Sequence, residues 1–583
     1  MRWSIVKNKR MIETKDLEGH TESFEMSGES VSGIVIYGAE NGKLNTTLNV
    51  VFPGLRVQPN NTGGSYCVRG ISTLELLGAE VFKKAQLSGV LTLYSHTDTA
   101  SVKRTFYPSA ALSCFYEDIE ITAVNSDVTP VYEVAERLET RLGCEGYIYA
   151  CRVADKKPVT VKTGSTFRVI FAYKAYLANE NPPFETDALG GRTARVEELL
   201  SECDLTTGDD VIDTAFAFAK IRAGESIFRT KKGLVHCPGG YSYYAAVWCN
   251  DQLEYAAPWF AFTGDGKAME ATENAFGWYE PYMNDEYRPL PSSIVAEGLD
   301  CWNGAGDRGD ASMYLFGLSR YLLTTGKKPD KNQENALRWC VEYIKHNTLP
   351  DGAVFSDSDE LEGRLSTGVN LSTASLSYGG LGLVSLVWKK YGKDGLYREA
   401  TELREHIGKS FEEHFGAEIK GYKTYAYHKG CDSIRAWNCL PVYMGVFDRA
   451  EGTLSSIESA LWNGCGCRSA EGEETTWDRS TLYFIASLFR AGKTEKAFSM
   501  LKRYSEERLL GERVPYPVEA YPEGNMRQLS AESALYCRVI TDGLFNIVSD
   551  GNTFSFRREF PFLPNGVSLK NVFINGEHRD IEI

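Results

Sequence analysis

The sequence lacks the excess of positive charge by which proteins bind nucleic acids and anionic membranes. Its 583 residues include 63 Lys and Arg against 78 Asp and Glu, a formal net charge of −15. We therefore expect no nucleic-acid partner and no membrane partner. The same balance disfavours a polyanionic substrate, so a neutral ligand is the default expectation.

The sequence also lacks long apolar runs and a regular cysteine pattern. Its N-terminal segment has no apolar core of the kind found in secretory signals, and no run of about 18 apolar residues follows that could span a bilayer. The 14 cysteines show no repeating spacing, and several fall in segments with a buried pattern. Free thiols in a reducing cytosol explain this better than disulfides do. The predicted location is cytoplasmic.

Residues 1–185 have the pattern of β structure. Segments such as VSGIVIYG and TFRVIFAYKAYL are rich in β-branched and aromatic residues, and Gly, Asn, Asp and Pro mark the turns between them. Many short strands without intervening helices predict a large antiparallel β-sandwich. Because a chain of this length cannot form one core, the polar segment 186–208 is predicted to be the linker to a second domain.

From residue 209 onward the period becomes helical, and about twelve helices are expected. Five connections between them are short and polar: TGDGK, TTGKKPD, YGKDG, DRAEGT and RAGKT. The other connections are long: 226–250, 283–309, 348–371, 416–432, 464–478 and 511–529. This alternation predicts helical hairpins whose long loops all meet at one face.

The helices alternate in polarity as well. The segment 494–510 places its apolar residues on one stripe, as an amphipathic outer helix does. The segment 372–391 has no charge between Thr373 and Trp388, so it must be buried on all sides. Six outer and six inner helices describe an (α/α)6 toroid over 209–550. The predicted fold class is α+β and multidomain: the sandwich, then the toroid, then a short β tail over 551–583.

The six long loops bring carboxylates, Trp and Arg to one rim. Acidic residues before helices often serve as N-caps and dipole partners, and Asp310 and Asp478 fit that role best. Capping does not explain a Trp near the end of four of the loops. Because aromatic faces stack on sugar rings and charged side chains bind hydroxyls, the combination favours a carbohydrate pocket. Glycosidic cleavage needs two carboxyls, one protonated and one ionised.

The helical half, about two-thirds of the chain, resembles the six-hairpin glycosidase superfamily, which includes glucoamylases and α-L-rhamnosidases. Trp248-Cys-Asn-Asp251 is similar to the Trp-x-Arg-Asp motif of glucoamylases, whose Asp holds sugar hydroxyls in the deepest subsite. Asn250 stands in place of the Arg, so a preference for glucose is not implied. Asp307-Arg308-Gly309-Asp310 resembles the Arg-Asp-Gly segment of the next loop, and the segment 522–536 loosely matches the pattern before the last helix.

This resemblance implies an exo-acting, inverting glycoside hydrolase without a cofactor or metal. The general acid is expected in the loop before the sixth helix, at Glu360 or Glu362, with Glu360 preferred. The general base is expected before the twelfth helix, at Glu523, with Glu519 and Glu532 as alternatives. The expected partner is an oligosaccharide or glycoside, and a homo-oligomer stays open. The predicted substrate-binding residues are Trp248, Asp251, Trp302, Arg308, Asp310, Trp437, Glu474, Trp477, Glu519 and Arg527.

Four other functions are possible on the same scaffold or with the same residues. A zinc enzyme would use His428, Cys431, Cys465 and Cys467, although C-x-C alone is a weak signal. A sugar epimerase on the same toroid relies on paired histidines, and the chain has only eight. An inverting phosphorylase would keep the acid and replace the base with phosphate. A carbohydrate-binding protein without catalysis would bind sugar without turnover.

Overall fold

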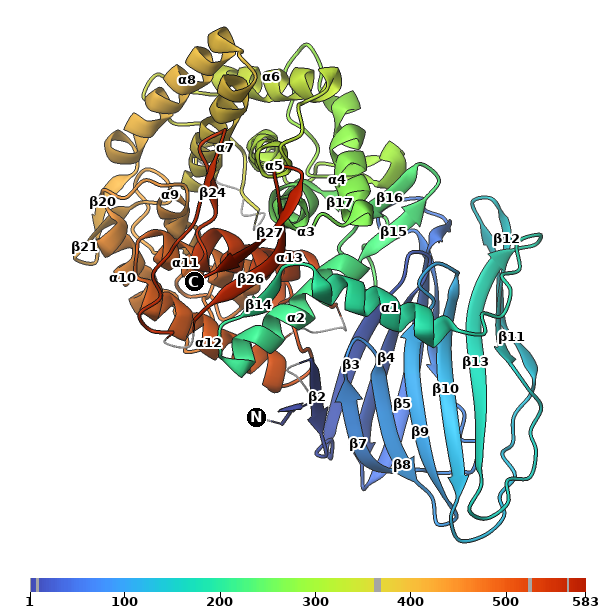
Figure 1. Cartoon of the computed structure of the whole chain (residues 1–583). Helices are drawn as coiled ribbons and strands as arrows, with labels where there is room; N and C mark the ends of the chain where they lie inside the picture. The colour runs from blue at the N-terminus through green and yellow to red at the C-terminus, as the bar shows by residue number, and fades with distance from the viewer. Residues whose placement is uncertain (1, 7–9, 361–367, 523–526, 564–565) are drawn as a thin grey trace.

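The N-terminal third of the chain is an antiparallel β-sheet domain, seen at the lower right of Figure 1. The computed structural model describes residues 2–6, 10–360, 368–522, 527–563 and 566–583. Its main strands pair in the order β11-β12-β13-β10-β9-β8-β7-β5-β4-β3. The sheet folds over itself, so that β3 and β4 face β9, β5 faces β13, and β6 faces β11. These strands are β3 (His20–Ser27), β4 (Ser32–Glu40), β5 (Lys43–Arg56), β6 (Ser65–Ser72), β7 (Val81–Leu87), β8 (Leu91–His96), β9 (Ala100–Pro108), β10 (Cys114–Ala123), β11 (Ala135–Gly143), β12 (Gly146–Ala154) and β13 (Thr166–Leu177).

Residues 210–544 form a closed ring of helical hairpins (Figure 1). The inner helices are η1 with α3 (Cys249–Ala256, Ala257–Thr263), α5 (Asp310–Thr325), α7 (Leu371–Lys390), η4 with α9 (Ala436–Cys439, Leu440–Tyr443), α11 (Asp478–Arg490), and α13 with η5 (Ala531–Arg538, Val539–Leu544). Each packs on the next, and α13 closes the ring on η1 and α3. The outer helices are α2 (Asp210–Glu225), α4 (Gly266–Tyr279), α6 (Lys331–His346), α8 (Asp394–Glu413), α10 (Ala450–Leu461) and α12 (Thr494–Leu510).

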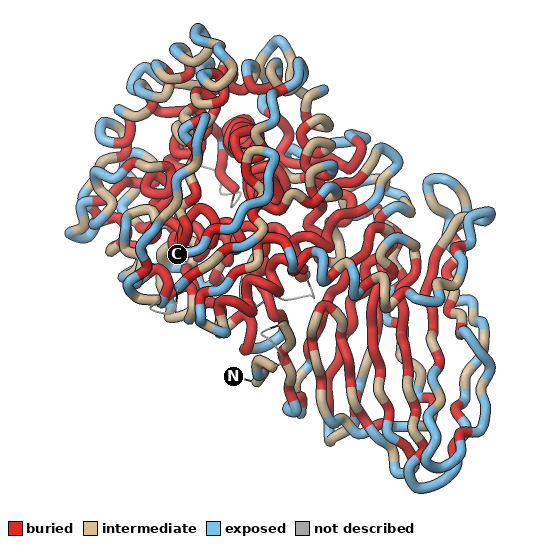
Figure 2. The backbone as a smooth tube through the Cα atoms, in the orientation of Figure 1, coloured by how far each residue is buried: buried red, intermediate tan, exposed pale blue. Residues whose placement is uncertain are grey.

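Burial explains the two helix patterns seen in the sequence. The inner helices are buried along most of their length (Figure 2), whereas α6 and α8 bury one stripe. The helix α7 is long and apolar enough to cross a membrane, but 72% of its apolar window is buried, and it packs between α5, α8 and α9. One outer helix departs from the pattern: α2 is buried on nearly all sides because α1, α12, α13 and β3 cover it. The predicted sandwich and toroid are confirmed.

The two ends of the helical ring differ in the length of the connections that they carry. Connections of two to six residues join each inner helix to the following outer helix, at one end of the ring. The inner helices begin at the other end, where the long loops meet. These loops carry short strands that the sequence pattern did not reveal: β15 (Ile227–Thr230) with β16 (Gly233–His236), β17 (Ala246–Trp248) with β18 (Ser293–Val295) and β19 (Cys301–Trp302), β20 (Gly416–Ile419) with β21 (Tyr422–Tyr425), and β22 (Thr476–Trp477) with β23 (Ala520–Tyr521).

The segment predicted as a linker and the tail also form regular structure. The linker contains α1 (Ala188–Ser201) and β14 (Asp204–Thr206), and α1 packs on α2. Strand β14 pairs with β26 (Ser568–Ile574), which pairs with β27 (Glu577–Glu582). Because β26 also packs on α3 and α5, the tail lies against the toroid. The remaining short strands are β1 (Ser4–Val6), β2 (Met11–Thr14), β24 (Val548–Ser549) and β25 (Phe554–Ser555), and the two 3-10 turns are η2 (Glu280–Tyr282) and η3 (Ala296–Gly298).

Candidate active site

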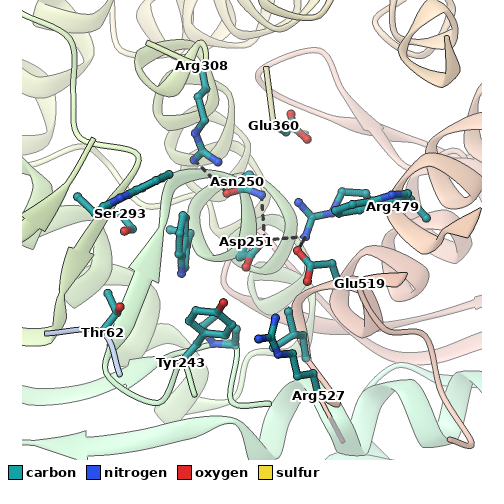
Figure 3. Close-up of a pocket in the computed structure, with 15 residues that line it drawn as sticks. Thr62, Tyr243, Asn250, Asp251, Ser293, Arg308, Glu360, Arg479, Glu519 and Arg527 are labelled. Carbon is teal, nitrogen blue, oxygen red and sulfur yellow. Dashed lines mark hydrogen bonds and ion pairs between the residues drawn. The ribbon is translucent and has the colours of Figure 1, made fainter. Parts of the chain in front are cut away.

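A cavity of about 430 Å³ opens where the long loops converge (Figure 3). Its floor is formed by the first turns of inner helices, and its walls come from loops far apart in the sequence. The sandwich contributes one residue, Thr62, from the connection between β5 and β6. The lining side chains are Thr62, Pro238, Tyr243, Trp248, Asn250, Asp251, Ser293, Trp302, Arg308, Glu360, Trp477, Arg479, Glu519, Arg527 and Leu529.

Two carboxyl groups meet at the buried side of the cavity. Glu360 and Glu254 hydrogen-bond through their carboxyls. One oxygen of each accepts a phenol hydroxyl, that of Tyr255 on Glu360 and that of Tyr483 on Glu254. The other two oxygens, Glu360 Oε1 and Glu254 Oε2, have no further partner among the described residues. A single proton between the carboxyls would satisfy both oxygens.

The environment places that proton on Glu360. Burial raises the pKa of the Glu360 carboxyl well above its usual range, and the adjacent Glu254 raises it further. Burial also raises the pKa of Glu254, but its hydrogen bonds to Tyr483 and Glu360 favour its ionised form. Only 3% of the Glu360 residue is exposed, so water does little to stabilise a carboxylate there. Burial and the adjacent Glu254 therefore favour the protonated form of Glu360, which can donate a proton.

A second cluster of carboxylates surrounds the buried guanidinium of Arg479. Its Nη2 lies 2.6 Å from Glu532 Oε1, 3.4 Å from Glu519 Oε1 and 3.5 Å from Asp251 Oδ1. Burial raises the pKa of Glu532 to about 8 and that of Asp251 to about 6, although Arg479 opposes both shifts. Glu519 differs from these two because 30% of its side chain is exposed, at the cavity wall. It is a carboxylate that solvent and a ligand can both reach.

A third group lies at the start of α5. Arg308 Nη2 donates to Asn250 Oδ1 at 3.3 Å and to Asp310 Oδ1 at 3.0 Å, and Asn250 Nδ2 donates to Asp251 at 3.0 Å. Gly309 has φ +86°, and a side chain there would meet Thr373 Oγ1 at 2.8 Å. Because glycine alone tolerates both constraints, the chain turns sharply enough to direct Arg308 into the cavity and begin α5 at the next residue.

Aromatic rings line the outer part of the cavity. The rings of Trp248 and Trp302 lie 5.5 Å apart, and the Arg308 guanidinium lies 5.6 Å from the Trp248 ring centre. Trp302 is 39% exposed, and Trp477 is half-buried on the other side beside Arg479. Flat apolar faces beside carboxylates and guanidinium groups suit a ligand that has both C–H faces and hydroxyl edges.

The structure brings most of the sequence-predicted residues together. Those that line the cavity are Trp248, Asp251, Trp302, Arg308, Glu360, Trp477, Glu519 and Arg527. Glu362 and Glu523 lie outside the described residues. Glu532 lies behind the cavity wall, fully buried against Arg479.

Three predicted substrate-binding residues do not line the cavity. Asp310 is fully buried and pairs with Arg308. Trp437 is fully buried and packs its ring edge-on against Tyr483, because the inner helix that it begins turns it into the core. Glu474 is exposed outside the cavity. Of these, only Asp310 can act on a ligand indirectly, by holding Arg308.

Asp310 and Asp478 lie in the first turns of α5 and α11, where a carboxylate interacts favourably with the helix dipole. Their prediction as N-caps is wrong, because the N-cap residues are Gly309 and Trp477 and neither helix has a side-chain cap. Asp478 instead accepts from Arg508 Nη2 at 2.5 Å and from the backbone of Val518 at 2.9 Å. Both aspartates are fully buried and held by arginine, so they fix the loops that shape the cavity.

Sequence reasoning missed several cavity residues. Arg479 is the second residue of α11, directly after Asp478, and that proximity was the available signal. Glu254, a carboxylate at the end of the first long loop to which the sequence pattern assigned no role, lies in η1 behind the cavity lining. Thr62, Tyr243 and Ser293 carried no signal in the sequence pattern, because only the tertiary packing brings them to the cavity.

The four residues considered for a zinc site each contact different neighbours. Cys431 Sγ lies near Ser433, Cys465 Sγ near Asn463, and Cys467 is fully buried. His428 is directed to the carbonyl of Lys429. Within the described part of the chain, no three His, Cys, Asp or Glu side chains gather as metal ligands.

Comparisons with known proteins bear on the fold. No known family profile matches the sequence. No curated protein matches it significantly. Solved structures do match. A protein assigned as a kojibiose phosphorylase from the human microbiome aligns over 100% of this chain and 94% of its own, with a TM-score of 0.60 and 10% identity. A bacterial glucoamylase with bound acarbose aligns over 93% and 94%, with a TM-score of 0.51 and 10% identity. The chain therefore has the six-hairpin fold with its N-terminal β domain.

Proposed function

We propose that this protein is an exo-acting, inverting glycoside hydrolase. The observation that carries the proposal is that the buried carboxyl of Glu360, whose surroundings favour its protonated form, lines the same cavity as the solvent-accessible carboxylate Glu519. Figure 3 shows these two side chains on either side of the Arg479 guanidinium. One acid and one base facing the same space are the minimum that glycosidic cleavage requires. The shared fold with a glucoamylase and a phosphorylase supports the same class of chemistry.

The proposed reaction moves one proton to the leaving group and removes one from water. Glu360 turns its proton from Glu254 to the glycosidic oxygen as the bond from that oxygen to the anomeric carbon breaks. A water molecule attacks the anomeric carbon from the opposite side, and Glu519 accepts a proton from it. The product sugar then has the inverted configuration. Glu523, the base implied first by the resemblance, lies outside the described residues and is the alternative in the same loop.

The shape of the cavity supports attack at a chain end. The inner helices close the ring beneath it, where Tyr255, Tyr483 and Trp437 are fully buried. A cavity closed at its base accepts the terminal sugar of a chain but not its middle. Asp251, Arg308 and Trp248 would hold that sugar by its hydroxyls and its apolar face. Their arrangement suits a neutral sugar, since acidic and basic groups both reach the cavity.

An inverting phosphorylase is the second candidate, and one observation favours it. Three guanidinium groups line the cavity, those of Arg308, Arg479 and Arg527. Arg479 and Arg308 contact carboxylates, whereas no described carboxylate forms an ion pair with Arg527. Arginine binds phosphate oxygens well, so phosphate could take the place of the attacking water. The third candidate is a protein that binds a sugar without turnover, and the assays described below distinguish it from the two enzymes.

The free thiols bear on the location that we propose, the cytoplasm. All 14 cysteines are unpaired, and eight are fully buried, among them Cys203, Cys249 and Cys467. A reducing compartment keeps such thiols reduced.

The function is tested by a screen of aryl glycosides and oligosaccharides, with and without inorganic phosphate, and by NMR of the first-formed anomer. We expect release of a terminal sugar of inverted configuration that does not depend on phosphate. Strict phosphate dependence with a sugar phosphate as product would establish the phosphorylase instead. Retention of configuration would refute the proposed mechanism. Glu519→Gln and Glu523→Gln, compared side by side, identify the base as the one whose loss abolishes turnover.

A further inference from the structure

A second, smaller cavity lies at the opposite end of the toroid from the active site. It has a volume of about 100 Å³ and is lined by later turns of α5, α7 and α11, by α9 and by η5. We call it the lower cavity and define it by Arg320, Leu383, Tyr443, Arg490 and Asp542. It shares no lining residue with the active-site cavity. Arg490 and Leu383 are half-buried, so the lower cavity reaches the surface beside them.

The lower cavity has more positive than negative charge. Arg320 Nη2 lies 2.9 Å from Asp542 Oδ1, and Arg538 Nε lies 3.1 Å from Asp542 Oδ2. Arg490 donates to the neutral Asn546 at 2.9 Å. Burial and the nearby Arg490 lower the pKa of Arg557, which lies outside the cavity lining. Asp542 thus pairs with Arg320 and Arg538, whereas Arg490 and Arg557 have no ion pair with a described carboxylate, in a chain whose net charge is −15.

The protein's own acceptors do not neutralise this excess. The other contacts of these arginines are neutral, such as the carbonyls of Ile547, Leu544 and Glu254. The Nε atoms of Arg320 and Arg490 are buried, and they have no acceptor among the described residues. A half-buried charge without a counter-charge, as at Arg490 and Arg557, carries part of the cost of burying an ion, and the buried Nε donors without an acceptor add to that cost. Both costs would fall if an anion were bound.

We infer that the lower cavity binds a small inorganic oxyanion of the phosphate or sulfate class. Guanidinium groups match the oxygens of such ions in geometry and charge. The lower cavity, at about 100 Å³ against about 430 Å³ for the active-site cavity, has room for one tetrahedral anion. The Tyr443 hydroxyl, 2.6 Å from Arg538 Nη2 and 3.1 Å from Asp542 Oδ2, provides a further polar group. The site is independent of the proposed glycosidase function.

Calorimetric titration with inorganic phosphate tests this inference, with sodium chloride at equal ionic strength as the reference. We expect saturable binding of one phosphate, with a matching rise in Tm. Arg490→Gln should weaken phosphate by about tenfold or more, the value of a hydrogen bond to a charged group. Leu383→Trp fills the mouth while leaving every arginine in place, so it should also abolish binding. If Arg490→Gln does not fold, phosphate binding by Leu383→Trp tests the lower cavity in its place.

Arg527→Gln is the matched control, because it removes an arginine from the active-site cavity. It should leave the affinity of the lower cavity for phosphate unchanged. Binding that is lost in Arg527→Gln but kept in Arg490→Gln and Leu383→Trp would place phosphate in the active site and overturn the inference. Absence of saturable phosphate and sulfate binding to the wild-type protein would overturn it too. Neither result would bear on sugar hydrolysis without phosphate.

Discussion

Glu254 and Glu360 hydrogen-bond carboxyl to carboxyl, and a tyrosine hydroxyl holds the outer oxygen of each. Two buried carboxyls in direct contact cannot both be ionised without a large cost in free energy. Glu254 therefore acts as a positioning residue that keeps the proposed acid protonated. It does not line the cavity, so it has no direct contact with the substrate.

Glu254→Gln is expected to lower the pKa of Glu360. The amide removes a negative charge and can donate a hydrogen bond to the Glu360 carboxylate, and both effects favour ionisation. The alkaline limb of kcat/KM should move to lower pH, on the order of one unit. Tyr255→Phe is the matched control, because it removes a hydroxyl that lowers the pKa of Glu360, and so should move the limb upward. If both variants keep the wild-type profile, Glu360 is not the group that titrates.

The aromatic wall is expected to act on substrate binding more than on the chemical step. Trp302→Ala removes a half-exposed ring at the cavity mouth and should raise KM about tenfold, with little change in kcat. Trp437→Phe provides the comparison, because Trp437 is buried away from the cavity. It should lower Tm and leave KM near the wild-type value. Steady-state kinetics and thermal unfolding of the two variants separate these roles.

A carboxyl far from the cavity should make stability fall as pH rises. Burial raises the pKa of Glu202 to about 8 in the folded state, and nearby Asp265 adds to the shift. In the unfolded chain the pKa returns to about 4.3. The folded state therefore holds the proton more tightly, and its stabilising effect is complete below the unfolded pKa and lost between the two values. Glu202→Gln should unfold at higher urea than the wild type at pH 8 and at similar urea at pH 4.5. An equal difference at both pH values would contradict this.

The fold could be predicted because burial leaves a clear pattern along the chain. The segment that forms α7 has to be free of charge, since neighbours surround it, and that requirement is visible in the sequence. The alternation of short and long connections then gives the ring. This logic fails for α2, because its outward side is covered by α1, which lies in the segment predicted as a linker.

The site could be predicted only in part, because the sequence shows neither the direction of each side chain nor how the two domains pack together. Loop ends correctly nominated residues such as Trp248 and Arg308 as neighbours of one cavity. The sequence does not say which way a side chain points, however, and Trp437 points into the core although it follows a long loop, as the pocket residues do. The contribution of Thr62 depends on how the sandwich packs on the toroid, and no local pattern encodes that.

The central claim is that Glu360 donates the proton to the leaving group. Its most direct test is kcat/KM of Glu360→Gln on two glycosides of the same sugar, one with an alkyl leaving group and one with dinitrophenol. Dinitrophenolate leaves without protonation, so the account predicts near wild-type hydrolysis of that substrate and a loss of about 100-fold or more on the alkyl glycoside. Equal losses on both substrates, or none on either, would contradict it.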